Sequence, residues 1–108
     1  MNKSIHESGK RKRAIARATL NDGSGIIRIN NQLLEHLNNK IAKLKILEPL
    51  MLAGDVTKKI DINVKVAGGG FQSQAEAARL AIAKGLVEFT KSDKLKSTFL
   101  DYDRHLLV

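Results

Sequence analysis

The stretch from Ile60 to Val66 constrains the fold more than any other part of the chain, because it alternates strictly between apolar and polar residues. Four β-branched side chains point one way and polar groups point the other way, which predicts a half-buried β-strand. Three glycines follow at Gly68 to Gly70, and an apolar stripe with gaps of three and four then runs from about Gln72 to Phe89. This stripe predicts a long helix that packs on the sheet.

A second alternating segment runs from Arg11 to Leu20, and it also predicts a strand. A glycine-containing loop at residues 21–25 leads to residues 26–30, which we expect to pair with the first strand in a β-hairpin. Residues 1–9 are polar and show no apolar period, so they are expected to form a short flexible basic arm. Residues 10–108 are then expected to form a single domain.

The remaining apolar residues recur at helical spacing. A group of leucines at residues 33–37 predicts a short helix, and the pattern from Lys40 onward predicts a longer one. Pro49 disfavours helical geometry at the residue before it, so we expect a break there and a second short helix after it. Ser92 is a suitable N-cap for a last helix that ends near Leu100. The order of elements predicts an α+β fold in two layers, with helices on one face of a small sheet.

Positive charge is concentrated near the N-terminus. The chain carries 19 Lys and Arg against 11 Asp and Glu, and residues 1–19 hold six of the basic residues but only one of the acidic ones. A fixed cluster of cations indicates a polyanionic partner, and nucleic acid is the commonest one. An anionic membrane surface would require a basic amphipathic helix, which this cluster does not have. Two simpler interpretations stay open, a solvated basic edge that discourages strand aggregation and a nuclear-import address.

The cations beside the first predicted strand are the first candidate site. Arginine pairs with phosphate oxygens through two hydrogen bonds, and lysine neutralises charge without directional demands. Residues two apart on a strand share a face at a spacing of about 6.7 Å, so the three arginines of this segment are expected to form a row about 20 Å long. The candidate residues are Lys10, Arg11, Lys12, Arg13 and Arg17.

The glycine-rich junction is the second candidate site. A strand that enters a helix through glycine presents backbone N–H groups to a phosphate at the helix N-terminus. The junction matches neither a dinucleotide fingerprint, because Ser73 stands where a third glycine is needed, nor a P-loop. A tight turn that brings two backbone segments together is the simpler interpretation, and a small nucleotide-using enzyme is an alternative. The residues from which phosphate contacts are expected are Gly68, Gly69, Gly70, Gln72, Ser73 and Gln74.

Signals for catalysis, metals or cofactors are weak. The chain has no cysteine, which excludes disulfides, thiolate metal sites and cysteine nucleophiles. The three histidines show no metal-ligand spacing, and paired carboxylates such as Asp101 and Asp103 need a cleft to work as catalysts. We therefore expect no enzyme activity and no cofactor. The absence of cysteine, of an apolar signal region and of an apolar run near ~18 residues favours a reduced, intracellular compartment and no membrane partner.

Several segments resemble one family of ribosomal proteins. Over residues 8–108 the chain is similar to the small-subunit ribosomal protein family numbered nine in the S series, in its archaeal and eukaryotic form. The matching segments are Gly9-Lys10-Arg11-Lys12 with Ala16-Arg17, Gly23-Ser24-Gly25 with Arg28-Ile29-Asn30, Leu47-Glu48-Pro49-Leu50, Asp61 to Gly70, Gln74 to Ala77, Arg79 to Ala83, and Tyr102-Asp103-Arg104 with Leu106-Leu107-Val108.

The resemblance implies a structural component of the small-subunit head that binds ribosomal RNA and supports translation in cytoplasmic ribosomes. It implies the fold of the second domain of ribosomal protein S five, a two-layer α/β sandwich with a left-handed βαβ crossover, and neighbouring head proteins as partners. By motif position, Lys10, Arg11, Lys12 and Arg17 are expected to touch RNA. Gly68, Gly69 and Gly70, together with Gln72 to Gln74, are expected to approach a second RNA segment.

One departure concerns transfer RNA. The family continues past the Leu-Leu-Val stretch with a basic tail that reaches the peptidyl-tRNA site, whereas this sequence stops at Val108. The tRNA contact is therefore expected only through such a tail and is assigned to no residue here. A non-ribosomal basic protein that binds RNA or coats DNA is the alternative, although the sequence offers no groove-reading helix or apolar wedge for DNA.

Overall fold

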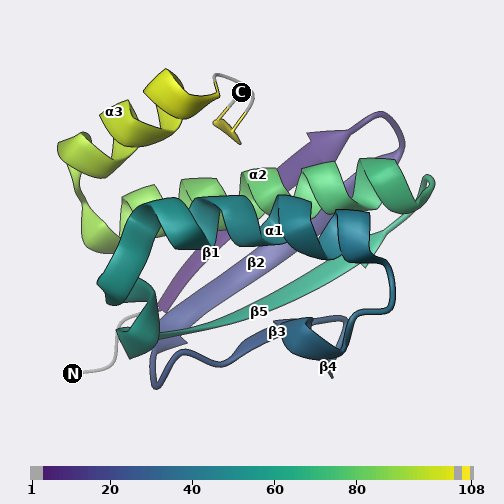
Figure 1. Cartoon of the computed structure of the whole chain (residues 1–108), viewed down its shortest axis with the longest axis horizontal. Helices are drawn as coiled ribbons and strands as arrows, with labels where there is room; N and C mark the ends of the chain where they lie inside the picture. The colour runs from purple at the N-terminus through teal and green to yellow at the C-terminus, as the bar shows by residue number, and fades with distance from the viewer. Residues whose placement is uncertain (1–3, 104–105, 108) are drawn as a thin grey trace.

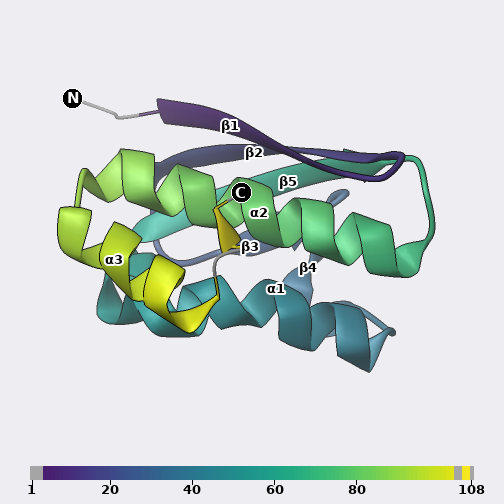
Figure 2. The same ribbon diagram turned by 90° about the horizontal axis from the view of Figure 1, so that it is seen from above.

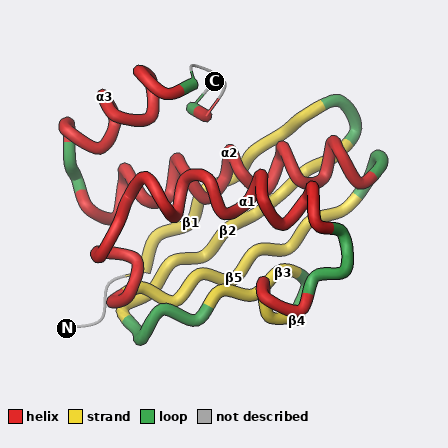
Figure 3. The backbone as a smooth tube through the Cα atoms, viewed as in Figure 1, coloured by secondary structure: helices red, strands yellow, loops and turns green. Residues whose placement is uncertain are grey.

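A five-stranded sheet forms one layer of the fold (Figure 1, Figure 3). The computed structural model describes residues 4–103 and 106–107. The strands are β1 (Ser4–Arg11), β2 (Ala14–Asp22), β3 (Ile27–Ile29), β4 (Gln32–Leu33) and β5 (Ile60–Ala67). They lie in the order β1-β2-β5-β3-β4, in which β3 and β5 are parallel and the other neighbours are antiparallel.

Helices form the second layer and lie on one side of the sheet (Figure 2). They are α1 (Lys40–Ala53), α2 (Phe71–Thr90) and α3 (Asp93–Tyr102), with 3-10 turns η1 (Leu34–His36) and η2 (Gly54–Lys59). The long helix α2 lies against β1, β2 and β5, α1 packs beside α2, and α3 contacts both helices. The expected two-layer α+β class is therefore confirmed.

The core lies between the sheet and α2, on the side that the alternating pattern predicts. Every second residue of β2 from Ala14 to Leu20 is buried, as are three apolar residues of β5. The facing side of α2 is rich in alanine, and a Cβ at Gly85 would collide with the side chain of Leu20. These small residues let the axis of α2 lie close to the strands.

The expectation of a flexible arm over residues 1–9 is wrong for residues 4–9, which belong to β1. β1 pairs with β2 along its whole length, from Ser4 opposite Asn21 to Arg11 opposite Ala14. The Nζ atom of Lys84 in α2 also donates to the carbonyl oxygen of Ser8 at 2.9 Å. Backbone hydrogen bonds to β2 and the contact with Lys84 hold this strand. Neither interaction requires a regular spacing of apolar residues, so the sequence pattern does not indicate it. Residues 1–3 lie outside the described residues.

The predicted hairpin between residues 11–20 and 26–30 is also wrong, because β5 lies between the two segments. β2 pairs with β5 on one side, and β3 pairs with β5 on the other. The loop from β2 to β3 therefore passes the beginning of β5, where the Gly23 N–H donates to the carbonyl oxygen of Lys59 at 2.8 Å. A strand distant in sequence occupies the place that a local hairpin partner was expected to take.

Asp61 fixes this loop in place. Its Oδ1 atom accepts the backbone N–H groups of Ser24 at 2.9 Å and Ile26 at 3.0 Å. A Cβ at Gly23 would collide with the same carboxylate, so a larger residue there would displace the group that holds the loop. These backbone hydrogen bonds, with that of Ile26 the strongest influence, lower the pKa of Asp61 below its ordinary value, and the charge of Arg28 lowers it slightly further.

We expect Asp61→Ala to lower the free energy of unfolding by about 1 to 2 kcal/mol at pH 7, because two backbone donors lose a charged acceptor. Asp61→Asn keeps one acceptor oxygen and should lose less. Because the pKa of Asp61 is lowered in the folded state, the ionised carboxylate stabilises the fold fully above the unfolded pKa of about 3.9. This stabilisation is lost as the pH falls through the folded-state pKa. Urea unfolding between pH 7 and pH 2.5 measures this loss. If the free energies of unfolding of the wild type and Asp61→Asn differ by the same amount at pH 7 and at pH 2.5, the predicted loss of stabilisation is contradicted.

The break predicted at Pro49 is wrong, since α1 runs without interruption from Lys40 to Ala53. A proline inside a helix removes a backbone hydrogen bond and costs about 3 kcal/mol. Pro49 is buried together with Ile46 and Leu50 against the core. This packing stabilises the continuous helix despite the local cost.

The connection between the parallel strands β3 and β5 contains α1, so it is a βαβ crossover. The left-handed sense that the resemblance implies stays a prediction. Across the described residues, no helix combines the length and the apolar character needed to cross a bilayer.

Candidate nucleic-acid interface

The turn between β1 and β2 carries two exposed cations at one end of the sheet. β1 ends at Arg11 and β2 begins at its register partner Ala14, so Lys12 and Arg13 form the whole turn. Lys12 takes a left-handed backbone conformation with φ of 53°, and both side chains are exposed. The turn therefore presents two positive charges beyond the last residues of the sheet.

The predicted row of three arginines on one strand is wrong, because the chain reverses between Arg11 and Ala14. Arg11 lies on the helix side of the sheet, where it lines a hollow with carboxylates of α1 and α2, and its guanidinium donates to the Lys10 carbonyl oxygen at 3.0 Å. Lys10 and Arg17 lie on the opposite side and are exposed. The five predicted cations thus point in three directions.

The glycine-rich loop packs directly against this turn. Gly68 and Gly69 have φ of 82° and 66°, a backbone conformation that favours glycine. A Cβ at Gly68 would also collide with the carbonyl oxygen of Arg13. The tight-turn interpretation of the triple glycine is confirmed, and this turn brings both candidate sites to the same end of the molecule (Figure 1).

The first turn of α2 completes this end. Gln72 is exposed and Ser73 is half-buried, whereas the Gln74 side chain is occupied because its Nε2 donates to the Gly68 carbonyl oxygen at 3.1 Å. The first backbone N–H groups of a helix have no acceptor within the helix and carry partial positive charge, which adds to that of the turn. We call Lys12, Arg13 and the segment from Gly68 to Gln74 the hairpin end.

The side of β1, β2 and β5 that faces away from the helices is here called the bare sheet face. Register places Arg17 between Ser8 and Lys65 on this face. The sequence pattern did not indicate Lys65 as a candidate, although it occupies a polar position of the alternating strand β5. It also did not indicate Phe71 of the hairpin end, which is 75% exposed at the start of α2. Along these three strands the residues of the bare sheet face are Ser4, His6, Ser8, Lys10, Ile15, Arg17, Thr19, Asn21, Asp61, Asn63, Lys65 and Ala67.

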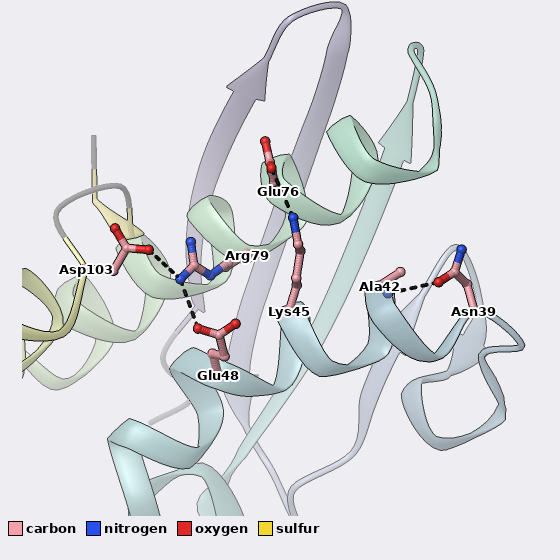
Figure 4. A network of polar contacts seen from close by, with 7 residues as sticks. All are labelled: Asn39, Ala42, Lys45, Glu48, Glu76, Arg79 and Asp103. Atoms are coloured by element: carbon pink, nitrogen blue, oxygen red, sulfur yellow. Dashed lines mark hydrogen bonds and ion pairs between the residues drawn. The ribbon is translucent and has the colours of Figure 1, made fainter.

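A separate network of charged side chains connects the helices (Figure 4). Arg79 of α2 donates at 3.0 Å to Glu48 of α1 and at 3.0 Å to Asp103, which follows α3. Burial lowers the pKa of Arg79, but the two carboxylates outweigh this effect and raise the pKa above its ordinary value. The negative charge of Glu48 and its hydrogen bond raise the pKa of the Tyr102 hydroxyl. These charges pair within the protein and stabilise the helix layer.

Potential metal ligands are scattered in the part of the chain that the structure describes, where no group of three or more His, Asp or Glu residues is placed to hold a metal ion. The Nδ1 atom of His6 lies 3.2 Å from Oγ1 of Thr19 on the bare sheet face, and His36 lies in η1. His105 lies outside the described residues.

Comparison with known proteins decides the family. A family model described as ribosomal protein S9/S16 matches residues 9–108. The chain belongs to this family. It is 56% identical over 105 residues to the small ribosomal subunit protein uS9 of Desulfurococcus amylolyticus, covering 97% of this chain and 75% of the relative. It is 52% identical over 106 residues to the uS9 protein of Methanococcus vannielii, covering 98% of this chain and 79% of the relative.

The ribosomal protein S9/S16 family is the one that the sequence motifs indicate, so the resemblance is confirmed. As a member of this family, the chain is a structural ribosomal protein and not an enzyme. The matched range contains the hairpin end and every cation of the bare sheet face.

Proposed function

We propose that the chain binds small-subunit ribosomal RNA through phosphate contacts at the hairpin end, as a structural component of the small ribosomal subunit. Its relatives carry the name small ribosomal subunit protein. The observation that carries the proposal is the close approach of Gly68 to the Arg13 carbonyl oxygen, because it places the cationic turn directly beside the loop that leads into the N-terminus of α2.

The chemistry of this surface suits a phosphate backbone. Lys12 and Arg13 supply exposed side-chain charges, and the beginning of α2 supplies backbone N–H donors. Contacts of this kind position a protein on folded RNA by its shape and charge, and they carry little information about base sequence. Binding is then favoured by the release of counterions from the RNA.

The proposed location is the head of the small subunit in cytoplasmic ribosomes, near the peptidyl-tRNA site and beside other head proteins. This location is supported by the resemblance of the motifs that run from Gly9 to Val108. Contact with tRNA is assigned to none of the residues of this chain.

Salt dependence provides the first test. If about five phosphates are neutralised, the affinity for small-subunit ribosomal RNA should fall with salt at a log–log slope of about −3.5 to −4.5. Filter binding with transcribed small-subunit ribosomal RNA of Methanococcus vannielii measures this slope, and a slope near zero would contradict the proposal. Duplex DNA as competitor tests the DNA-coating alternative, which requires DNA to bind as well as the RNA does.

The double variant Lys12→Gln/Arg13→Gln tests the hairpin end itself. We expect its affinity at 0.1 M salt to be about 25- to 60-fold weaker and its salt slope to be smaller in magnitude by about 1.4 to 1.8, because two phosphate contacts are lost. The control Lys94→Gln/Lys96→Gln removes the same charge from exposed positions of α3. Equal losses in the two variants would show that net charge, and not the hairpin end, determines binding.

A further inference from the structure

On the bare sheet face, cationic residues of neighbouring strands lie side by side. The helices lie on the other side of the sheet (Figure 2). Arg17 of β2 is the direct register partner of Lys65 in β5, and neighbouring strands lie about 4.8 Å apart. Lys10 lies on the same side of β1, two residues beyond Ser8, the other register partner of Arg17. All three cationic residues are exposed.

This arrangement is unfavourable in the free protein, since like charges directly opposite each other destabilise a sheet. Within residues 4–103 and 106–107, Arg17, Lys65 and Lys10 form no ion pair. The one carboxylate on the same side of β5, that of Asp61, is already bonded to the backbone of the loop between β2 and β3. An anionic ligand would supply the charge compensation that the protein lacks here.

Neutral hydrogen-bonding groups lie between the cations. A shallow hollow of about 460 Å³ on this face is lined by Ser8, Thr19 and Asn63 together with both cations of the register pair. Glu7 lies at its edge, but its carboxylate is directed to α2, where it lies 3.8 Å from Nζ of Lys84. Hydroxyl and amide groups donate hydrogen bonds to phosphate oxygens. The described strands β1, β2 and β5 contain no Phe, Tyr or Trp on which a base could stack, so this face suits the phosphate backbone and not the bases.

We propose that the bare sheet face is a second RNA-binding surface, on which Arg17 and Lys65 together hold the phosphate backbone of one RNA segment. This inference rests on the proposed function, because the ligand is taken to be the same ribosomal RNA. The like-charge pair then lowers the stability of the free protein and raises its affinity for RNA. These two effects have opposite signs and can be measured separately.

The double variant Arg17→Gln/Lys65→Gln tests both effects. The Tm of the free variant should rise by about 1 to 4 °C, because the repulsion is removed. Its affinity for transcribed small-subunit ribosomal RNA of Methanococcus vannielii should fall about 25- to 60-fold at 0.1 M salt, with a salt slope smaller in magnitude by about 1.4 to 1.8. The control Lys94→Gln/Lys96→Gln has the same net charge as this variant. Its rise in Tm and its loss of RNA affinity should both be clearly smaller.

Each outcome decides between the two proposals. A wild-type salt slope in the Arg17→Gln/Lys65→Gln variant overturns the inference, as does a loss of affinity no larger than that of the control. A loss confined to the Lys12→Gln/Arg13→Gln variant supports the proposed function and rejects the bare sheet face. Binding of the wild type without salt dependence rejects both. A lower Tm of the face variant would show that the pair stabilises the sheet, which contradicts the like-charge argument.

Discussion

Gly9→Ala is expected to destabilise the protein by about 3 kcal/mol, because α2 lies almost in contact with the backbone of β1. A Cβ at Gly9 would lie 2.5 Å from the Ala77 carbonyl oxygen, 2.8 Å from the Ala81 nitrogen and 3.0 Å from Cβ of Leu80. Two of these three atoms belong to the helix backbone, which cannot yield locally as a flexible side chain can. The helix must therefore move away from β1 and open the core beneath it.

Urea unfolding followed by circular dichroism measures this effect. Ser8→Ala is the matched control, because Ser8 precedes Gly9 in β1 but faces the bare sheet face, and its change should stay within about 0.5 kcal/mol. A loss below about 1 kcal/mol for Gly9→Ala would show that β1 and α2 can separate at little cost, against the close packing described above. Complete loss of cooperative unfolding agrees with the prediction.

The second large effect is expected for Arg79→Met, which should lower the free energy of unfolding by about 3 kcal/mol. Removal of one partner from a buried ion pair costs about 3 to 5 kcal/mol, because the remaining charge stays buried without compensation. The side chains of Glu48 and Asp103 are 30% and 34% exposed, so both carboxylates keep some water and the lower end of the range applies. Methionine retains the packing of the aliphatic stem, so the loss reports on the charge.

Lys45→Met provides the comparison within the same helix layer. Lys45 pairs with Glu76 at 3.1 Å, but both side chains are more accessible than that of Arg79, at 26% and 35% exposure against 11%. An accessible pair of this kind contributes at most about 1 kcal/mol. Similar losses for Lys45→Met and Arg79→Met in chemical unfolding would contradict a special role of Arg79 in joining α1, α2 and the segment after α3.

Local sequence signals predicted several elements well. The alternating stretch forms β5, and the predicted helix from about Gln72 to Phe89 corresponds to α2, which is one residue longer at each end. Ser92 caps α3 as expected, because its side chain accepts the Leu95 N–H at 3.1 Å. Each of these signals acts over a few residues along the chain, where the period of apolar residues or one hydrogen bond is sufficient.

The candidate site was only partly predictable from sequence. The residue types in the turn and in the glycine loop indicated phosphate binding, but the contact between Gly68 and Arg13 joins segments more than fifty positions apart. The reversal after Arg11 directs that side chain toward the helices, and the pairing of β2 with β5 brings Lys65 beside Arg17. The alternation of residues along the sequence indicates which side chains share a face of one strand. It does not indicate which residues of two different strands lie opposite each other.

The sequence by itself determined the family, the two-layer α+β class, the strand at β5, the long helix and the excess of positive charge. The tertiary structure alone decided that β1 is a strand, that β5 separates β2 from β3, and which cations share a surface. The physical reason is the range of the interactions. Periodicity and capping are local, whereas strand order and register depend on backbone hydrogen bonds between distant segments and on the packing of α2 over Gly9.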